Sequence, residues 1–198
     1  MTTTDSCDGS GLRPDGKQDT MKDEELFWEI AGEIVSHAKF EESRNYIQHG
    51  SISVFEHSID VARLSFYMGS CFKNMDRRTL VRGGLLHDFF LYDWHVPEKM
   101  WSLHGWTHPV TAAENAKKYF NVSDREYFCI RSHMWPYTLF HPPKCREGWI
   151  ICLADKICSL TETLFKRNRS LKLNRENTLR PRKAGTEDCR QRKIAYRT

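Results

Sequence analysis

Apolar residues recur every three to four positions in several segments of this chain, which is the spacing of one face of an α-helix. In the segment that follows residue 52, for example, Val54, Val61, Leu64 and Met68 fall on one stripe. No segment shows the sustained alternation that is typical of a half-buried strand. The pattern predicts an all-α fold with about six helices. These helices are expected over residues 22–40, 53–72, 77–89, 107–119, 123–134 and 146–165.

The connections between these predicted helices differ in character. Residues 41–51 are polar, and residues 135–143 are rich in proline and aromatic rings. Residues 90–106 form a long irregular stretch with many aromatic rings. Loops this long in a compact domain are usually functional or disordered, and the aromatic content argues against disorder. We expect the next helix to begin at 107–109, because Pro109 suits the first helical position.

Both ends of the chain lack apolar periodicity and are predicted to be disordered. At the N-terminus this applies to residues 1–20. At the C-terminus it applies to residues 166–198, where 12 Lys and Arg outnumber 3 Asp and Glu. The rest of the chain carries 18 Lys and Arg against 23 Asp and Glu, so the body is mildly acidic and only the tail is basic. We therefore expect one domain, residues 21–165, between two disordered segments.

The composition argues against several classes of protein. No run approaches the roughly 20 apolar residues of a membrane span, and the polar N-terminus lacks the apolar core of a secretory signal. Seven cysteines without a C-x-x-C pair argue against a disulfide framework or a cysteine zinc site. The basic tail contains a single aromatic residue, Tyr196, and no recognisable nucleic-acid module, which disfavours a nucleic-acid partner. These features predict a cytoplasmic protein.

Polar residues that bind metals occur on the apolar stripes of these helices. His57 falls on the stripe of its helix, and Asp155 lies among apolar residues of the last helix. His87 and Asp88 follow each other at the end of a third helix. A carboxylate on a buried face is costly unless it is paired, protonated or bound to a metal. Imidazole and carboxylate groups on separate helices could converge on one transition-metal site, which would satisfy all of them.

The helix that leads to His87 contains two adjacent glycines, Gly83 and Gly84. Each glycine lowers helix stability by roughly 1 kcal/mol relative to alanine. This cost is easiest to explain if another backbone approaches closely there, so the pair predicts a tight helix contact beside the candidate site.

The order of these residues on successive helices resembles the HD-domain superfamily of metal-dependent phosphohydrolases. FEHSIDVARLS around His57 resembles the first motif of that family, LVRGGLLHDFF resembles its signature, and IICLADKICSLTE resembles its closing Asp motif. The signature is followed by Phe89-Phe90 rather than Ile-Gly-Lys, so the resemblance does not extend to the cyclic-di-GMP phosphodiesterase branch. The resemblance implies an HD-like orthogonal helical bundle.

The resemblance also implies a metal set. In the family, the positions that match His57, His87, Asp88 and Asp155 bind metal. Members with two further histidines hold two ions with the signature Asp between them. His108 in HGWTHPVTAAENA and His133 in CIRSHMW match those two positions. The chain therefore resembles a binuclear member, with two divalent ions of Mn, Fe, Co or Ni, or with Zn.

Other residues are candidates for work around such a centre. The predicted acid–base residues, besides Asp88, are Asp93, His95 and His104 on the long aromatic stretch. The predicted substrate-binding residues are Arg82, Arg131 and Lys156 for phosphate, and Trp94 and Trp101 for stacking on a base. The flat rings could stack on a base, while the acidic body and the absence of a Gly-rich phosphate cradle argue against capture of polyphosphates by the protein alone. We therefore expect a small phosphorylated substrate, a nucleotide that is either a monophosphate or a dinucleotide.

Two other functions remain open at this stage. An HD-type domain that senses a ligand or acts as a scaffold would keep the metal site but would turn over weakly. A di-iron oxygenase would use the same scaffold and the same types of ligand. The sequence leaves the oligomeric state and the exact substrate undefined.

Overall fold

The computed structural model describes the backbone of residues 16–49, 52–93 and 101–179, and the side chains of residues 21–48, 52–93 and 105–164. The chain divides into two compact units, Met1–Glu162 and Thr163–Thr198, and the fold and site below belong to the first. The predicted all-α fold is confirmed. No helix in the described part of the chain is long and apolar enough to cross a membrane.

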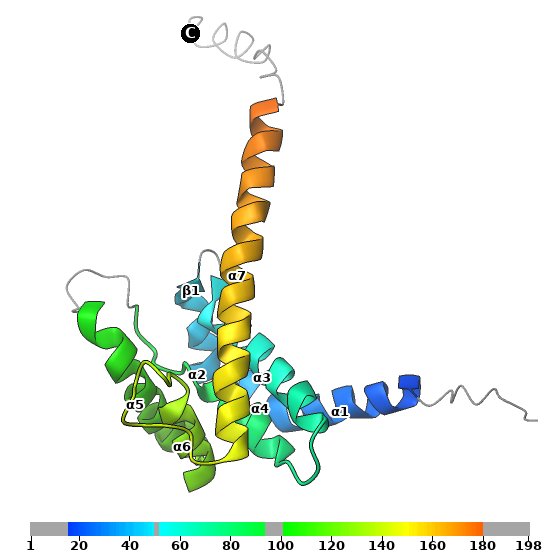
Figure 1. The fold of residues 1–198 in the computed structure, drawn as a ribbon, viewed down its shortest axis with the longest axis vertical. Helices are drawn as coiled ribbons and strands as arrows, with labels where there is room; N and C mark the ends of the chain where they lie inside the picture. Colours follow the sequence, from blue (N-terminus) through cyan, green and yellow to red (C-terminus); the bar gives the residue numbers. More distant parts are fainter. Residues whose placement is uncertain (1–15, 50–51, 94–100, 180–198) are drawn as a thin grey trace, which may run out of the picture. The chain divides into compact units, whose positions relative to one another are not determined.

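Seven α-helices, one 3-10 helix and a short hairpin make up the regular structure of the described residues (Figure 1). In chain order they are α1 (Gly16–Val35), α2 (Ala38–Glu41), the 3-10 helix η1 (Glu42–Asn45), β1 (Ile47–His49), β2 (Ile52–Ser53), α3 (Val54–Ser70), α4 (Arg77–Leu86), α5 (Trp101–Phe120), α6 (Asp124–Ser132) and α7 (Arg146–Leu179). Helix α4 packs against α1, α3 and α6, and α5 packs against α6.

Three helices that carry site residues begin at well-formed caps. Ser53 caps α3 and Ser123 caps α6, each in a capping box with the glutamate three residues later. Asp76 caps α4 by accepting a hydrogen bond from the backbone N–H of Thr79. These side chains satisfy N–H groups that have no partner within the helix, and so they fix where each helix starts.

The paired glycines lie where helices approach each other most closely. A Cβ atom added at Gly84 would lie 2.6 Å from the Cα of Ala62 on α3. A Cβ added at Gly83 would lie 2.7 Å from the Cδ1 of Ile151 on α7. The predicted close approach of another backbone is therefore confirmed at Gly84, while Gly83 makes room for a side chain of α7.

The main core lies between α1, α3, α4 and α5. Its buried aromatic residues include Phe27, Phe66 and Phe89, and α5 contributes Ala112, Ala113 and Ala116. Rings of this size bury a large apolar area and dominate the energetics of such a core. A smaller cluster, which includes Val61 of α3 and Ala154 and Cys158 of α7, holds α7 against α3.

Several predicted helix boundaries were wrong. Helix α1 starts at Gly16 rather than near residue 22, since no Gly or Pro stands between that glycine and Lys22. It also ends at Val35 rather than at residue 40, because His37 caps a separate short helix by accepting a hydrogen bond from the backbone N–H of Lys39. Helix α7 continues to Leu179, past the predicted end near 165. Its sequence there has no Gly or Pro before Pro181, so the loss of apolar periodicity did not mark the end of the helix.

Helix α5 begins earlier than predicted, at Trp101, and Pro109 lies inside it. A proline in a helix interior removes one backbone hydrogen bond and costs about 3 kcal/mol. The fully buried alanines of α5 show that tertiary packing offsets this cost. The predicted polar connection at 41–51 was also incomplete, because β1 pairs antiparallel with β2 through Ile47–Ser53 and His49–Ile52.

Candidate metal centre

The six residues predicted as metal ligands lie together in the structure. His57 is on α3, His87 and Asp88 directly follow α4, His108 is on α5, His133 ends α6 and Asp155 is on α7. All six are buried, none more than 7% exposed. Five helices therefore converge on one small polar cluster inside an otherwise apolar core.

Two of these imidazole rings are oriented by the last turn of their own helix. Nδ1 of His87 lies 2.7 Å from the carbonyl oxygen of Gly84, and Nδ1 of His133 lies 2.7 Å from that of Ile130. A carbonyl oxygen only accepts, so each Nδ1 carries the hydrogen and donates it. In the neutral form that binds a metal, each ring therefore has its lone pair on Nε2, which lies beside Asp88.

One side of the cluster is formed by His57, His87, Asp88 and Asp155. Nε2 of His57 lies 3.3 Å from Oδ1 of Asp155. Nε2 of His87 lies 3.2 Å from Oδ2 of Asp88 and 3.7 Å from Oδ1 of Asp155. The ligand atoms of His57, His87 and Asp88 are close enough to share a single cation, and Asp155 adjoins both histidines.

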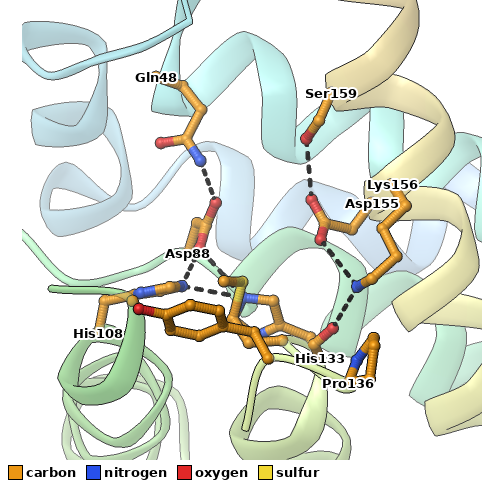
Figure 2. A pocket seen from close by; sticks show the side chains of 11 residues that line it. Gln48, Asp88, His108, His133, Pro136, Asp155, Lys156 and Ser159 are labelled. Atoms are coloured by element: carbon orange, nitrogen blue, oxygen red, sulfur yellow. Dashed lines mark hydrogen bonds and ion pairs between the residues drawn. The ribbon is translucent and has the colours of Figure 1, made fainter. Parts of the chain in front are cut away.

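The other side is formed by Asp88, His108 and His133. Oδ1 of Asp88 lies 3.3 Å from Nε2 of His108 and 3.4 Å from Nε2 of His133. The two Nε2 atoms are 3.0 Å apart. Asp88 therefore stands between the two groups, with Oδ2 facing His57 and His87 and Oδ1 facing His108 and His133. Figure 2 shows Asp88 with His108 and His133.

The cluster has the chemistry of a transition-metal site. Within the described part of the chain, Nε2 of His87 and Oδ1 of Asp88 are buried without a hydrogen-bond partner. Leaving such atoms unsatisfied costs free energy that a cation would recover. Imidazole nitrogens combined with carboxylate oxygens suit Mn, Fe, Co, Ni and Zn. The side chains present therefore fit divalent metal ions.

Strong electrostatic coupling holds these side chains together. Burial lowers the pKa of His57, but hydrogen bonds to Asp155 and Glu162 outweigh it and raise that pKa to about 9. Burial raises the pKa of Asp88, but the charge of His87 and the nearby imidazoles of His108 and His133 hold it well below its usual value. Burial keeps the pKa of His133 low. The carboxylates are thus ionised and ready to accept positive charge.

Two residues that hold this cluster were not singled out from the sequence. Oε1 of Glu162 on α7 lies 3.0 Å from Nδ1 of His57. The side-chain amide of Gln48 on β1 donates to Oδ2 of Asp88 at 2.5 Å. Glu162 follows Asp155 by two helical turns, a spacing that could have revealed it. Gln48 lies on a three-residue strand that the apolar pattern did not predict.

A cavity of about 590 Å³ opens onto the cluster. Its lining combines polar groups of the cluster with apolar residues of the loop after α6 (Figure 2). The lining residues are Gln48, Asp88, Gly105, His108, His133, Met134, Pro136, Tyr137, Asp155, Lys156 and Ser159. The ammonium group of Lys156 donates to the backbone carbonyl of His133 at 3.0 Å and lies 3.8 Å from Oδ2 of Asp155.

Of the three cations predicted to bind phosphate, Lys156 alone lines this cavity. The guanidinium of Arg82 is buried and donates to Oε1 of Glu126 and to the carbonyl of Phe120, each at 2.7 Å. Arg82 thus joins α4 to α6, and its predicted contact with substrate is corrected to a structural role. Arg131 lines a separate depression beside His141, because two residues along a helix turn a side chain away from the face of His133.

The remaining predictions concern the aromatic stretch before α5. Asp93 is exposed shortly after α4. Trp94 and His95 lie outside the described residues, and so do the side chains of Trp101 and His104. Their predicted roles in acid–base chemistry and stacking therefore stay predictions.

The family model for the HD domain matches residues 54–160. This match spans more than half of the chain and covers α3 to α7, including all six residues of the cluster. No curated protein and no solved structure matches the chain.

Proposed function

Because this chain belongs to the HD-domain family, a superfamily of metal-dependent phosphohydrolases, we propose that it hydrolyses a phosphate ester or anhydride of a small nucleotide. The observation that carries the proposal is a pair of buried atoms without a hydrogen bond, Nε2 of His87 and Oδ1 of Asp88, within a His/Asp cluster that lines a cavity. A cavity of about 590 Å³ is large enough for a small nucleotide.

The chain offers two metal positions that share Asp88. His57, His87, Asp88 and Asp155 would hold the first ion, and Asp88, His108 and His133 would hold the second. Two such ions, when bound, polarise a phosphoryl oxygen and lower the pKa of a coordinated water. The suitable ions are Mn, Fe, Co or Ni, with Zn as a further possibility.

The protein's own side chains prepare this site. The backbone carbonyls of Gly84 and Ile130 keep the lone pairs of His87 and His133 directed into the cluster. Glu162 orients His57 in the same way through its Nδ1 atom. Because these supports are buried, little reorganisation is needed when charge develops on a substrate.

Lys156 would assist the binding of the phosphoryl group. Its ammonium group lines the cavity and is held by the carbonyl of His133. A positive charge beside the metal cluster offsets part of the repulsion between substrate phosphate and the two aspartates. For protonation of the leaving group the candidates are Asp93 and His95, which precede α5, and His104 in its first turn.

The proposal is tested by metal analysis of protein purified without chelator, joined to a phosphate-release assay over nucleoside mono-, di- and triphosphates. We expect bound transition metal, a rise in thermal stability on adding Mn²⁺, and metal-dependent release of phosphate. His87→Ala and Asp88→Ala should abolish both metal binding and phosphate release. Metal-free protein that Mn²⁺ does not stabilise would refute the metal centre.

The same assay separates the other two functions. Bound metal without phosphate release from any nucleotide would favour a sensing or scaffolding domain. Bound iron with oxygen consumption would favour an oxygenase on the same scaffold.

A further inference from the structure

The loop between α6 and α7 forms one wall of the cavity, and none of its residues in that wall was predicted to have a function. Met134, Pro136 and Tyr137 of this loop line the cavity beside His133 and Lys156. In Figure 2, Pro136 and Lys156 lie on the same side of the site as His133. This wall is apolar, whereas the bottom of the cavity consists of the His/Asp cluster.

Tyr137 is placed by contacts with α5. Its ring centroid lies 5.2 Å from that of Trp106. A Cβ atom added at Gly105 would lie 2.6 Å from Cε1 of Tyr137. Only glycine at position 105 therefore leaves room for the ring where it lies. Gly105 and Trp106 stand one turn before His108 on the same helix, so the ring is located relative to the metal cluster.

The loop backbone also fixes Tyr137. Its N–H donates to the carbonyl of Met134 at 2.8 Å, and the N–H of Trp135 donates to the carbonyl of Ser132 at 3.1 Å. Lys156 holds the carbonyl of His133 from α7. With its backbone tied down at both sides, the half-exposed ring presents a flat surface to a ligand at low entropic cost.

The charges along the cavity limit the number of phosphoryl groups it can hold. Among the described residues that line it, Lys156 is the one Lys or Arg, while Asp88 and Asp155 are negative. A chain of several phosphates would extend beyond the metal cluster and would meet an apolar wall. The lining therefore suits one phosphoryl group attached to a flat, weakly polar body.

We propose that Tyr137 is the specificity-determining residue of this site, and that its ring contacts the base of a nucleoside monophosphate whose phosphate lies at the His/Asp cluster. The inference rests on the proposed phosphohydrolase function and adds to it the substrate class and the residue that selects it. Gly105 is the positioning residue for this ring.

The test compares adenosine 5′-monophosphate with ribose 5-phosphate, which is the same sugar phosphate without the base. Tyr137→Ala should raise KM for the nucleotide at least about fivefold, since stacking on a base contributes that much binding, with little change in kcat. KM for ribose 5-phosphate should stay unchanged. Tyr137→Phe, which keeps the ring, should behave as wild type.

Two further variants serve as a second probe and a control. Gly105→Ala should reproduce the selective rise in KM, because its methyl group displaces the ring, and alanine is a better helix former than glycine. Phe140→Ala is the control. It changes a ring of the same loop that is 83% exposed and does not line this cavity, so KM should stay unchanged for both substrates. Thermal unfolding checks that each variant is folded.

Calorimetric titration with the same two ligands requires no turnover and separates the two proposals. Suppose that the wild type releases no phosphate but binds the nucleotide, and that Tyr137→Ala weakens this binding. The proposed hydrolase function would then be wrong, while the proposed contact of Tyr137 with the base would stand. An active wild type in which Tyr137→Ala affects both ligands equally would overturn the ring contact and keep the hydrolase. A wild type that binds ribose 5-phosphate as tightly as the nucleotide would also overturn the ring contact.

Discussion

The carboxylate of Glu162 lies 3.0 Å from Nδ1 of His57 and accepts its hydrogen bond, while Nε2 of the same ring faces Asp155 at 3.3 Å. Glu162 and Asp155 are both on α7. One helix therefore supplies a candidate metal ligand and also the group that orients the histidine beside it. A carboxylate in this position fixes the ring tautomer and makes the opposite nitrogen a better donor.

Glu162→Gln should weaken metal binding without removing it. The amide keeps the size of the side chain and an acceptor oxygen, but it loses the charge that supports His57. Changes of this kind lower metal affinity by about tenfold or more, so we expect a weaker Mn²⁺ affinity by calorimetry and an unchanged number of ions. Glu114→Gln, on the exposed face of α5, is the control. An unchanged affinity in Glu162→Gln would show that the charge of Glu162 does not support His57.

A second prediction concerns Gln48, whose amide donates to Asp88. Gln48→Leu keeps similar bulk but removes this donor, which leaves the orientation of the shared carboxylate less defined. We expect Mn²⁺ affinity to fall by about tenfold and the free energy of unfolding to fall by about 1–3 kcal/mol. Ile47→Ala on the same strand tests whether any disturbance of the hairpin has this effect. Equal losses in both variants would assign the effect to the hairpin.

The metal cluster could be predicted from the sequence because its members are polar side chains at positions where the helical pattern predicts burial. A carboxylate such as Asp155 among apolar residues requires a partner, and the helical spacing shows which way it faces. Gln48 carries no such signal, since an amide in a short polar segment is unremarkable until the chain is folded. Arg82 was misassigned for a related reason. The sequence shows a cation near the signature motif, but it does not show whether that cation binds a phosphate or a carboxylate such as Glu126.

The centres of the predicted helices agreed with the structure better than their ends. Periodicity reports burial of a helix face, so it is informative for α3, where Val61 is fully buried. It gives no signal for α7 beyond residue 165, where the sequence has no apolar stripe, and it does not show that α5 begins at Trp101. Proline at position 109 suggested a helix start, but burial of the α5 alanines outweighed that local preference.

A third prediction concerns pH and the buried Glu147. Its carboxylate accepts hydrogen bonds from Arg125 at 2.8 and 3.1 Å and from the backbone N–H of Asp76 at 3.2 Å. Burial raises the pKa of Glu147, but these hydrogen bonds, first that of Arg125, lower it below its usual 4.5. Because the folded-state pKa is below the unfolded one, the stabilisation is present above about pH 4.5 and is lost as the pH falls through the folded-state pKa.

Urea unfolding of wild type and Glu147→Gln from about pH 7 down to about pH 3 measures this effect. The variant should be less stable by about 1–3 kcal/mol at neutral pH, and the difference should shrink in acid. Asp124→Asn, exposed in the first turn of α6, should show no such convergence. A difference that stays constant over the whole range would show that packing, not charge, makes Glu147 stabilising.

The last prediction separates one metal ion from two. Nε2 of His108 and Nε2 of His133 both face Oδ1 of Asp88, on the opposite side from His57 and His87. If these two histidines hold a second ion, His108→Ala or His133→Ala should lower the bound metal from about two ions per chain towards one. The remaining ion should stay, because His57, His87, Asp88 and Asp155 are untouched. Elemental analysis after dialysis measures the stoichiometry, and Asp88→Ala, which removes the shared carboxylate, should lose both ions. Two ions retained in both histidine variants would assign His108 and His133 to structure and leave a four-residue site.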